Sequence, residues 1–243
     1  MVLVTATAGE AGLSDGTGQH PPLGERRRVE LASAAEALGC ARWELLDYAD
    51  SGWGTPTGDP GDGAGPLTAA FSRLDPTVPA ARLAAILRGE RADALTVYDE
   101  RGGYGHPDHV QVHRVGVMAA ELAGTPVVLE ATVDRAQLQR VAAVMRWLPG
   151  LSRLLPPSRF ASSFLPRVEL THEVDVRRHL GAKRAALEAH ASQATGGRSP
   201  RTVALLLRLP RPVLGVALGR EWFRERGRPA AADLLDDVFA SLR

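Results

Sequence analysis

Two histidines three residues apart are the strongest candidates for chemistry in this sequence. His106 and His109 flank Asp108 in the segment 98–109, which reads YDERGGYGHPDH. Two imidazoles at this spacing can face the same side of a helix. Imidazole is a good zinc ligand, and a neighbouring carboxylate can fix its tautomer. A polar helix cap with surface histidines would explain a bare H-x-x-H. The whole segment favours a metal-dependent active site, because it gathers histidines, carboxylates and tyrosines behind an apolar run.

The candidate segment lies between a predicted strand and a predicted helix. Residues 94–98 form an apolar run typical of a strand, and residues 108–123 have the apolar spacing of a helix. Open α/β sheets bind ligands at the carboxyl ends of parallel strands. The same alternation runs through the first 148 residues, with strands expected at 2–6, 43–46 and 127–130 and helices at 25–38, 78–88 and 134–148. We therefore expect the α/β fold class, with a Rossmann-like parallel sheet and flanking helices.

The chain changes character after residue 149, where prolines mark an irregular crossing. Further elements are expected as a strand at 168–171, a long helix at 175–193 and a last helix from Asp233. The length of 243 residues suits one domain. We interpret residues 1–148 as its sheet-and-helix core and residues 149–243 as a C-terminal extension that completes the pocket.

Composition excludes several function classes. The chain has 29 basic and 28 acidic residues, so it carries no electrostatic footprint for nucleic acid. No apolar stretch approaches the roughly 18 residues of a membrane helix, and the N-terminus does not resemble a signal peptide. Cys40 is the sole cysteine, which fits a reducing compartment. These features predict a cytoplasmic protein that neither binds nucleic acid nor spans a membrane.

Five segments, in order, give the chain a specific resemblance. The segment 102–109 (GGYGHPDH) closely resembles the second motif of the PIG-L, or LmbE-like, zinc-dependent N-deacetylases, particularly their mycothiol-pathway members. The other four resemble the family's T-x-x-GE-G strand, R-x-x-EL helix, DSGM loop and K-x-A…H-x-SQ helix; here they are residues 5–12 (TATAGEAG), 27–31 (RRVEL), 50–53 (DSGW) and 182–193 (AKRAALEAHASQ). Any one match alone would be weak.

The resemblance implies a role for each matched residue. His109 would bind the metal, expected to be zinc with iron as an alternative. His106 would assist the oxyanion and the leaving amine, Asp108 would orient His106, and Tyr104 would stabilise the tetrahedral intermediate. The residues expected to bind the substrate are Arg27, Asp50 and His190. The implied activity is removal of an N-acetyl or similar acyl group from an amino sugar or sugar conjugate.

One family motif has no match in this sequence. The A-H-P-D-D-E motif after the family's first strand, which supplies two metal ligands and the general base, is absent from the 243 residues. Either the reading frame continues upstream of Met1, or the chain is a metal-free paralogue that binds sugar or acts as a scaffold. The sheet is expected to lack an inner strand, and the 243 residues alone are expected to be poorly stable or inactive. An upstream in-frame H-P-D-D-E would support the enzyme.

Other aromatic residues are expected outside the centre of the site. His113 is interpreted as a surface residue or as one that contacts the site residues without touching the substrate. His20, His172 and His179 are expected on solvated surfaces. Trp222 and Phe223 are expected in the core or at a dimer contact, so a homo-oligomer is left open.

Overall fold

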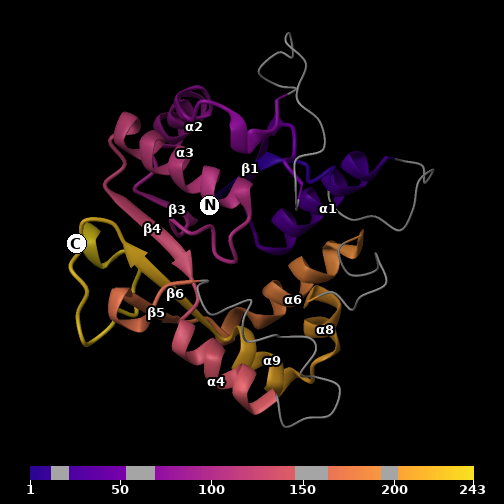
Figure 1. Cartoon of the computed structure of the whole chain (residues 1–243), viewed down its shortest axis with the longest axis vertical. Helices are drawn as coiled ribbons and strands as arrows, with labels where there is room; N and C mark the ends of the chain where they lie inside the picture. Colours follow the sequence, from indigo (N-terminus) through magenta and orange to yellow (C-terminus); the bar gives the residue numbers. More distant parts are fainter. Residues whose placement is uncertain (12–21, 53–68, 146–163, 193–201) are drawn as a thin grey trace. The chain divides into compact units, whose positions relative to one another are not determined.

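The computed structural model of the chain describes residues 1–11, 22–52, 69–145, 164–192 and 202–243 (Figure 1). It contains two compact units, and each unit combines two stretches of the chain. Unit 1 comprises Met1–Leu74 and Val176–Gly219, and unit 2 comprises Asp75–Asp175 and Arg220–Arg243. The named strands of the described residues form two sheets, one in each unit. His20 lies outside the described residues.

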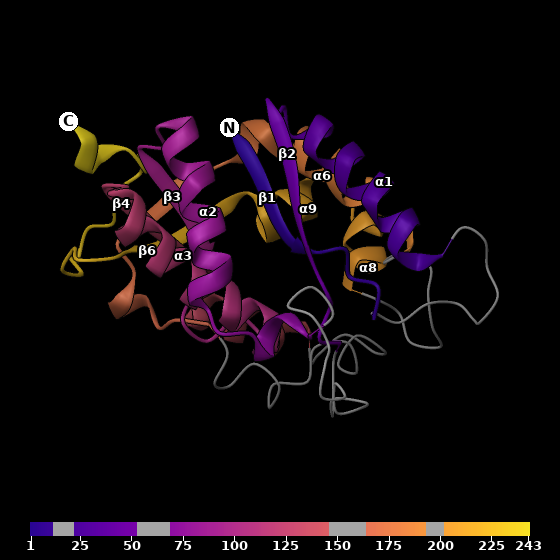
Figure 2. The same cartoon turned by 90° about the horizontal axis from the view of Figure 1, so that it is seen from above.

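Unit 1 is built on a two-stranded parallel sheet. β1 (Val2–Thr7) pairs with β2 (Arg42–Tyr48), and α1 (Leu23–Ala37) lies between them in the sequence. A helical crossover of this kind is what a parallel pair requires. Figure 2 shows the two strands side by side with α1 alongside β2, and α1 also packs against α6 (Leu180–Ala189). Within the described residues, unit 1 also contains η1 (Phe71–Arg73), η3 (Arg177–His179), α8 (Thr202–Arg208) and α9 (Arg211–Leu218).

Unit 2 contains a four-stranded sheet in the order β3-β4-β6-β5. β3 (Ala94–Tyr98) and β4 (Val127–Thr132) are parallel. β6 (Arg220–Glu225) is antiparallel to β4, and β5 (His172–Asp175) is antiparallel to β6 (Figure 1). The expected parallel pairing is therefore confirmed for β1–β2 and β3–β4. The strands from the C-terminal part of the chain continue the second sheet in the antiparallel sense.

The helices of unit 2 include the one that carries the candidate histidines. α2 (Thr77–Glu90) packs against α3 (Pro107–Ala123), and α3 packs against β3. The part of unit 2 that the structure describes also includes α4 (Arg135–Met145), η2 (Arg167–Glu169) and η4 (Ala240–Leu242). Within the described residues, no helix is long and apolar enough to cross a membrane.

Two buried clusters form the core around the antiparallel strands. One contains Val127, Leu129 and Phe223, and the other contains Leu165, Leu170 and Trp222. The core interpretation of Trp222 and Phe223 is therefore confirmed. Alternate residues of β6 point to opposite faces, so these two neighbours join different clusters.

Three expectations about the C-terminal region were wrong. Residues 167–169 form a 3-10 turn, and the strand follows at His172–Asp175. No long helix begins at Asp233, and only η4 forms near the C-terminus. His172 is fully buried, and its strand β5 is flanked by β6 on one side and by the chain at Leu235 on the other, where Glu173 donates a backbone hydrogen bond of 2.9 Å to Leu235. His179 is exposed, as expected.

Candidate active site

The candidate histidines lie where β3 ends and α3 begins. His106 is the N-cap of α3, and its Nδ1 accepts a hydrogen bond of 3.2 Å from the backbone N–H of Asp108. Pro107 follows at the first helical position, where its fixed φ suits the helix and its missing N–H costs nothing. Asp108 is only 6% exposed and lies in the first turn, where the helix dipole favours a negative charge. The sequence His-Pro-Asp-His is therefore a good helix start as well as a set of polar groups.

Four aromatic rings gather around this helix start. The ring centroids of His106 and His109 are 5.0 Å apart, so the two imidazoles lie side by side as predicted. Tyr104 meets His109 edge-on at 5.0 Å and His106 at 6.3 Å. Tyr98 stacks on His109, with centroids 3.9 Å apart and ring planes 4° from parallel. Contacts from Tyr98 and Tyr104 therefore restrict the orientation of the His109 ring.

The hydrogen bond to His106 determines what its other nitrogen can do. A backbone N–H can only donate, so Nδ1 of His106 must be the acceptor and a neutral ring carries its hydrogen on Nε2. His106 can therefore donate from Nε2 to a developing negative charge. His109 and the buried carboxylate of Asp108 add an imidazole and an oxygen donor, a set whose chemistry fits zinc or iron.

Tyr98 provides a neutral phenol beside His109. Desolvation raises the pKa of Tyr98 to about 12, and the neighbouring Tyr104 contributes to the rise. The Tyr98 side chain nevertheless remains 39% exposed as a whole. Its hydroxyl therefore stays protonated at neutral pH and keeps a hydrogen to donate.

The loop before His106 depends on backbone conformations that favour glycine. Gly102, Gly103 and Gly105 all have positive φ. A Cβ added at Gly102 would lie 2.8 Å from the backbone nitrogen of Val110, so a side chain has no room there. The N–H of Gly102 donates to the carbonyl of Asp99 at 2.8 Å, which closes a turn directly after β3. This turn brings the chain from the end of the strand to the start of α3.

In unit 1, the arginine and histidine predicted to bind substrate belong to one cluster. Arg27 is 8% exposed and donates from its guanidinium to the carbonyl of Gly9. One turn further along α1, Glu30 accepts two hydrogen bonds of 2.8 Å, from the backbone N–H and the hydroxyl of Ser192. Burial lowers the pKa of His190; Glu30 acts in the opposite direction and Arg27 in the same direction as burial. The R-x-x-EL and H-x-S segments therefore meet, while Gln193 lies outside the described residues.

Asp50 lies in a second cluster of unit 1, where two loops hold each other. Oε1 of Glu10 accepts a hydrogen bond of 2.7 Å from the backbone N–H of Asp50. Asp50 in turn accepts from the N–H groups of Ala11 and Gly52, each at 3.1 Å. Both carboxylate oxygens of Asp50 are thus engaged by backbone. Trp53, the last residue of the D-S-G-W match, lies outside the described residues.

An open cleft of 480 Å³ lies at the carboxyl ends of β1 and β2, and Glu10 is one of the residues that line it. Its charged lining residues are Glu10, Glu25, Arg28 and Asp47, and the last two form an ion pair.

Two polar residues near the helix start were not given a role by the sequence. Asp99 is fully buried, and its carboxylate accepts hydrogen bonds from two backbone N–H groups and from the hydroxyl of Thr132. Asp99 could have been noticed, because it ends a strand directly before a glycine loop. No sequence signal pointed to Thr132, which is 33 residues away.

Comparisons with known proteins agree with the sequence resemblance. Residues 1–120 match the family model described as PIG-L, GlcNAc-PI de-N-acetylase. A protein from Rhodococcus opacus named 1D-myo-inositol 2-acetamido-2-deoxy-alpha-D-glucopyranoside deacetylase is 34% identical over 87% of this chain and 78% of its own length. A protein of the same name from Nocardioides sp. is also 34% identical, over 100% of this chain and 89% of its own length.

Solved structures of low sequence identity show the same fold. A conserved protein from Thermus thermophilus has a TM-score of 0.53 at 19% identity, covering 97% of this chain and 85% of its own. The N,N'-diacetylchitobiose deacetylase from Pyrococcus horikoshii has a TM-score of 0.50 at 22% identity, covering 92% of this chain and 72% of its own.

Proposed function

Because this chain belongs to the PIG-L (GlcNAc-PI de-N-acetylase) family, we propose that it hydrolyses the N-acetyl group of an amino-sugar conjugate in a metal-dependent reaction. The observation that carries the proposal is the pair His106 and His109, whose rings lie 5.0 Å apart at the start of α3. Relatives named as deacetylases match this chain across most of its length. We also propose that the protein works in a reducing cytoplasm. The chain is proposed to form one domain, in which residues 149–243 extend a core made by residues 1–148.

The names of the relatives suggest the substrate class. Both relatives are named for a 2-acetamido-2-deoxyglucoside of myo-inositol. We propose that this chain acts on a similar N-acetylglucosaminide of a polyol. Arg27, Asp50 and His190 are proposed to bind its hydroxyl groups, because guanidinium, carboxylate and imidazole groups together offer both donors and acceptors.

His109 is the residue proposed to hold the metal, with zinc favoured and iron as the alternative. When bound, the ion lowers the pKa of water to about 7 and polarises the amide carbonyl. The contacts of Tyr98 and Tyr104 with the His109 ring limit its rotation, so the imidazole is held in one orientation for binding a metal ion.

His106 and Tyr104 are proposed to act on the reacting amide. The Nδ1 of His106 is engaged by the Asp108 amide, so its Nε2–H is the atom that can donate to the oxyanion or to the leaving nitrogen. Tyr104 is 49% exposed and lies edge-on to both imidazoles, so its hydroxyl is accessible to a bound substrate. Asp108 supports this arrangement through its backbone N–H.

The test is acetate release from an N-acetylglucosaminyl inositol by the chain together with any in-frame residues encoded upstream. We expect zinc-dependent release that a chelator abolishes and added zinc restores. His106→Gln should lower kcat by about 10²–10⁴-fold at unchanged zinc content, because it removes the proton donor. His179→Gln is the matched control, since it makes the same change at an exposed histidine. Sugar binding without acetate release, with or without zinc, would instead indicate a binding protein.

A further inference from the structure

The carboxylate of Asp99 is fully buried and interacts with three neutral donors. Oδ1 accepts from the backbone N–H of Arg101 at 3.1 Å and of Gly103 at 2.9 Å. Oδ2 accepts from the hydroxyl of Thr132 at 2.6 Å. A simple turn after β3 would need only Oδ1. The second oxygen reaches a different strand, so Asp99 does more than close its own turn.

The hydrogen bonds of Asp99 belong to a closed ring. The carbonyl of Gly103 accepts from the N–H of Phe164 at 3.1 Å. The next residue, Leu165, donates its N–H to the hydroxyl oxygen of Thr132 at 3.2 Å. Thr132 then donates to Asp99, which accepts from Gly103. The ring therefore joins three segments: the loop at 99–105 between β3 and His106, the end of β4, and the chain at 164–165.

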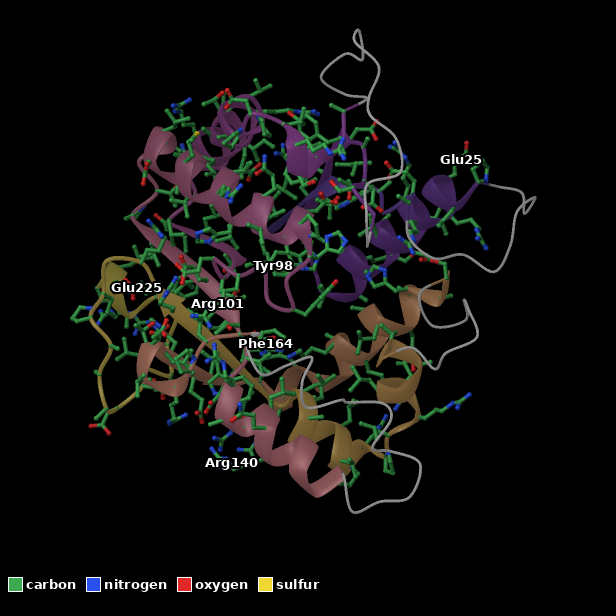
Figure 3. All side chains as sticks on the ribbon, viewed as in Figure 1. Glu25, Tyr98, Arg101, Arg140, Phe164 and Glu225 are labelled. Carbon is green, nitrogen blue, oxygen red and sulfur yellow. The ribbon has the colours of Figure 1, made fainter. Side chains whose placement is uncertain are left out.

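The segment at Phe164 is held in an unfavourable conformation by its neighbours. Phe164 has a φ of 61°, in the left-handed region that an L-residue with a Cβ seldom adopts. Its carbonyl accepts from the guanidinium groups of Arg101, at 3.3 Å, and Arg135. Figure 3 shows Arg101 and Phe164 close together beneath Tyr98. A Cβ at Gly103 would lie only 3.2 Å from the Phe164 ring, so the ring rests directly on the loop backbone. Strain of this kind persists where the surroundings over-determine it, often at functional sites.

We propose that Asp99 and Thr132 are positioning residues for the deacetylation, acting through this closed ring of hydrogen bonds. The proposal rests on the proposed function, because it assumes that Tyr104 and His106 act on the substrate. Gly103 immediately precedes Tyr104, and the ring fixes both its N–H and its carbonyl. The peptide groups on either side of Gly103 cannot rotate without breaking a buried hydrogen bond. This constraint on Gly103 limits the positions that Tyr104 and His106 can take after the end of β3.

The ring positions the loop and contributes little to the sheet. Thr132 is the last residue of β4 and pairs with Trp222 through its backbone, whereas its hydrogen bonds in the ring are made by the side-chain hydroxyl and run to residues outside the strands. Loss of the Thr132 hydroxyl removes one donor from Asp99 and one acceptor from Leu165. A buried group left without its partner costs free energy. We therefore expect the loop that carries these groups to lose its fixed position while the sheet persists. A displacement near 1 Å in a catalytic group can reduce the rate about 100-fold.

The experiment compares Thr132→Val with Thr132→Ser. Valine keeps the β-branched shape that suits a strand and removes the hydroxyl, whereas serine keeps the hydroxyl. We expect Thr132→Val to lower kcat by about 10- to 100-fold, with KM within about 2-fold and zinc content unchanged. Thr132→Ser should stay within about 3-fold of the parent in kcat. An equal loss in both variants, or a loss confined to KM, would overturn the proposal.

Hydrogen–deuterium exchange supplies a readout that does not depend on activity. The valine variant should increase amide exchange in peptides covering 99–106 and 164–170, but not in peptides covering β3 and α2. Faster exchange throughout unit 2 would indicate general destabilisation and count against a positioning role. If the parent protein released no acetate, the proposed function would fail, while the exchange pattern would still show whether the ring exists. Normal acetate release by a valine variant with loosened loops would refute the positioning role alone.

Discussion

The two polar loop systems that carry predicted site residues are held in different ways. In unit 2, the loop before α3 is anchored by Asp99, which is fully buried. In unit 1, Glu10 accepts from the backbone N–H of Asp50 and Asp50 accepts from the backbone N–H of Ala11, and both hydrogen bonds are exposed. A buried group that loses its partner remains unsatisfied, whereas an exposed group can bond to water instead. The unit 2 loop should therefore be the more rigid, and the unit 1 loops should tolerate more change.

The largest expected difference comes from replacing one glycine in each loop system. Gly102 and Gly52 have φ values of 65° and 68°, so alanine is strained at either position by roughly 1–2 kcal/mol. At Gly102 the new methyl would also meet the Val110 nitrogen at 2.8 Å, whereas at Gly52 the nearest atom is 3.6 Å away. We expect Gly102→Ala to cost about 2–5 kcal/mol in unfolding free energy and Gly52→Ala about 1–2 kcal/mol. Urea unfolding of both variants measures the contrast, and equal losses would contradict it.

A smaller effect is expected from Asp50→Asn in unit 1. The amide keeps one oxygen acceptor for backbone, and water can replace the lost bond, so stability should change by less than about 1 kcal/mol. If Asp50 binds a substrate hydroxyl, KM should rise by about 10-fold while kcat stays within about 3-fold. Steady-state kinetics separates the two constants. A fall in kcat alone would place Asp50 in the chemistry rather than in binding.

One histidine in each unit should make stability depend on pH in the same direction. Burial lowers the pKa of His172 in unit 2, opposed by Glu225 and Asp237 and reinforced by Arg228, and burial also lowers the pKa of His190 in unit 1. A histidine with a lowered folded pKa takes up its proton more readily when unfolded. Stability should therefore be fully present above about pH 6.5 and be lost as the pH falls below it. Unfolding at pH 7.5 and 5.5 should show a smaller loss in His172→Gln than in the parent.

The smallest effect is expected from the ion pair beside the unit 1 cleft. Arg28 and Asp47 are 44% and 56% exposed, and exposed pairs contribute about 0–1 kcal/mol. Arg28→Ala should therefore lower the unfolding free energy by no more than that amount. It should also remove the part of the salt dependence of stability that comes from this ion pair. A larger loss would show that the guanidinium supports α1 through its packing as well as its charge.

The sequence allowed the local elements of the site to be predicted, but not the contacts that join them. The histidine spacing, the strand before it and the helix after it are short-range features, and the structure has all three. The ring through Asp99, Thr132 and Leu165 depends on residues that are far apart in the chain. The position of β6 was hidden for the same reason, because β4 finds its partner about 90 residues later. The burial of His172 followed from a contact with Leu235 that periodicity does not report.

The interleaved path of the chain has a consequence for its biosynthesis. β6, which lies between β4 and β5, is contributed by residues 220–225, so the sheet begun by β3 and β4 stays unfinished on a ribosome until about 90 further residues have been made after β4. A nascent chain stalled near residue 175 would expose the free side of β4 and the apolar faces that Trp222 and Phe223 later cover. Such half-made sheets aggregate readily, so production of this protein should benefit from slow, cool expression and from chaperones that hold open chains.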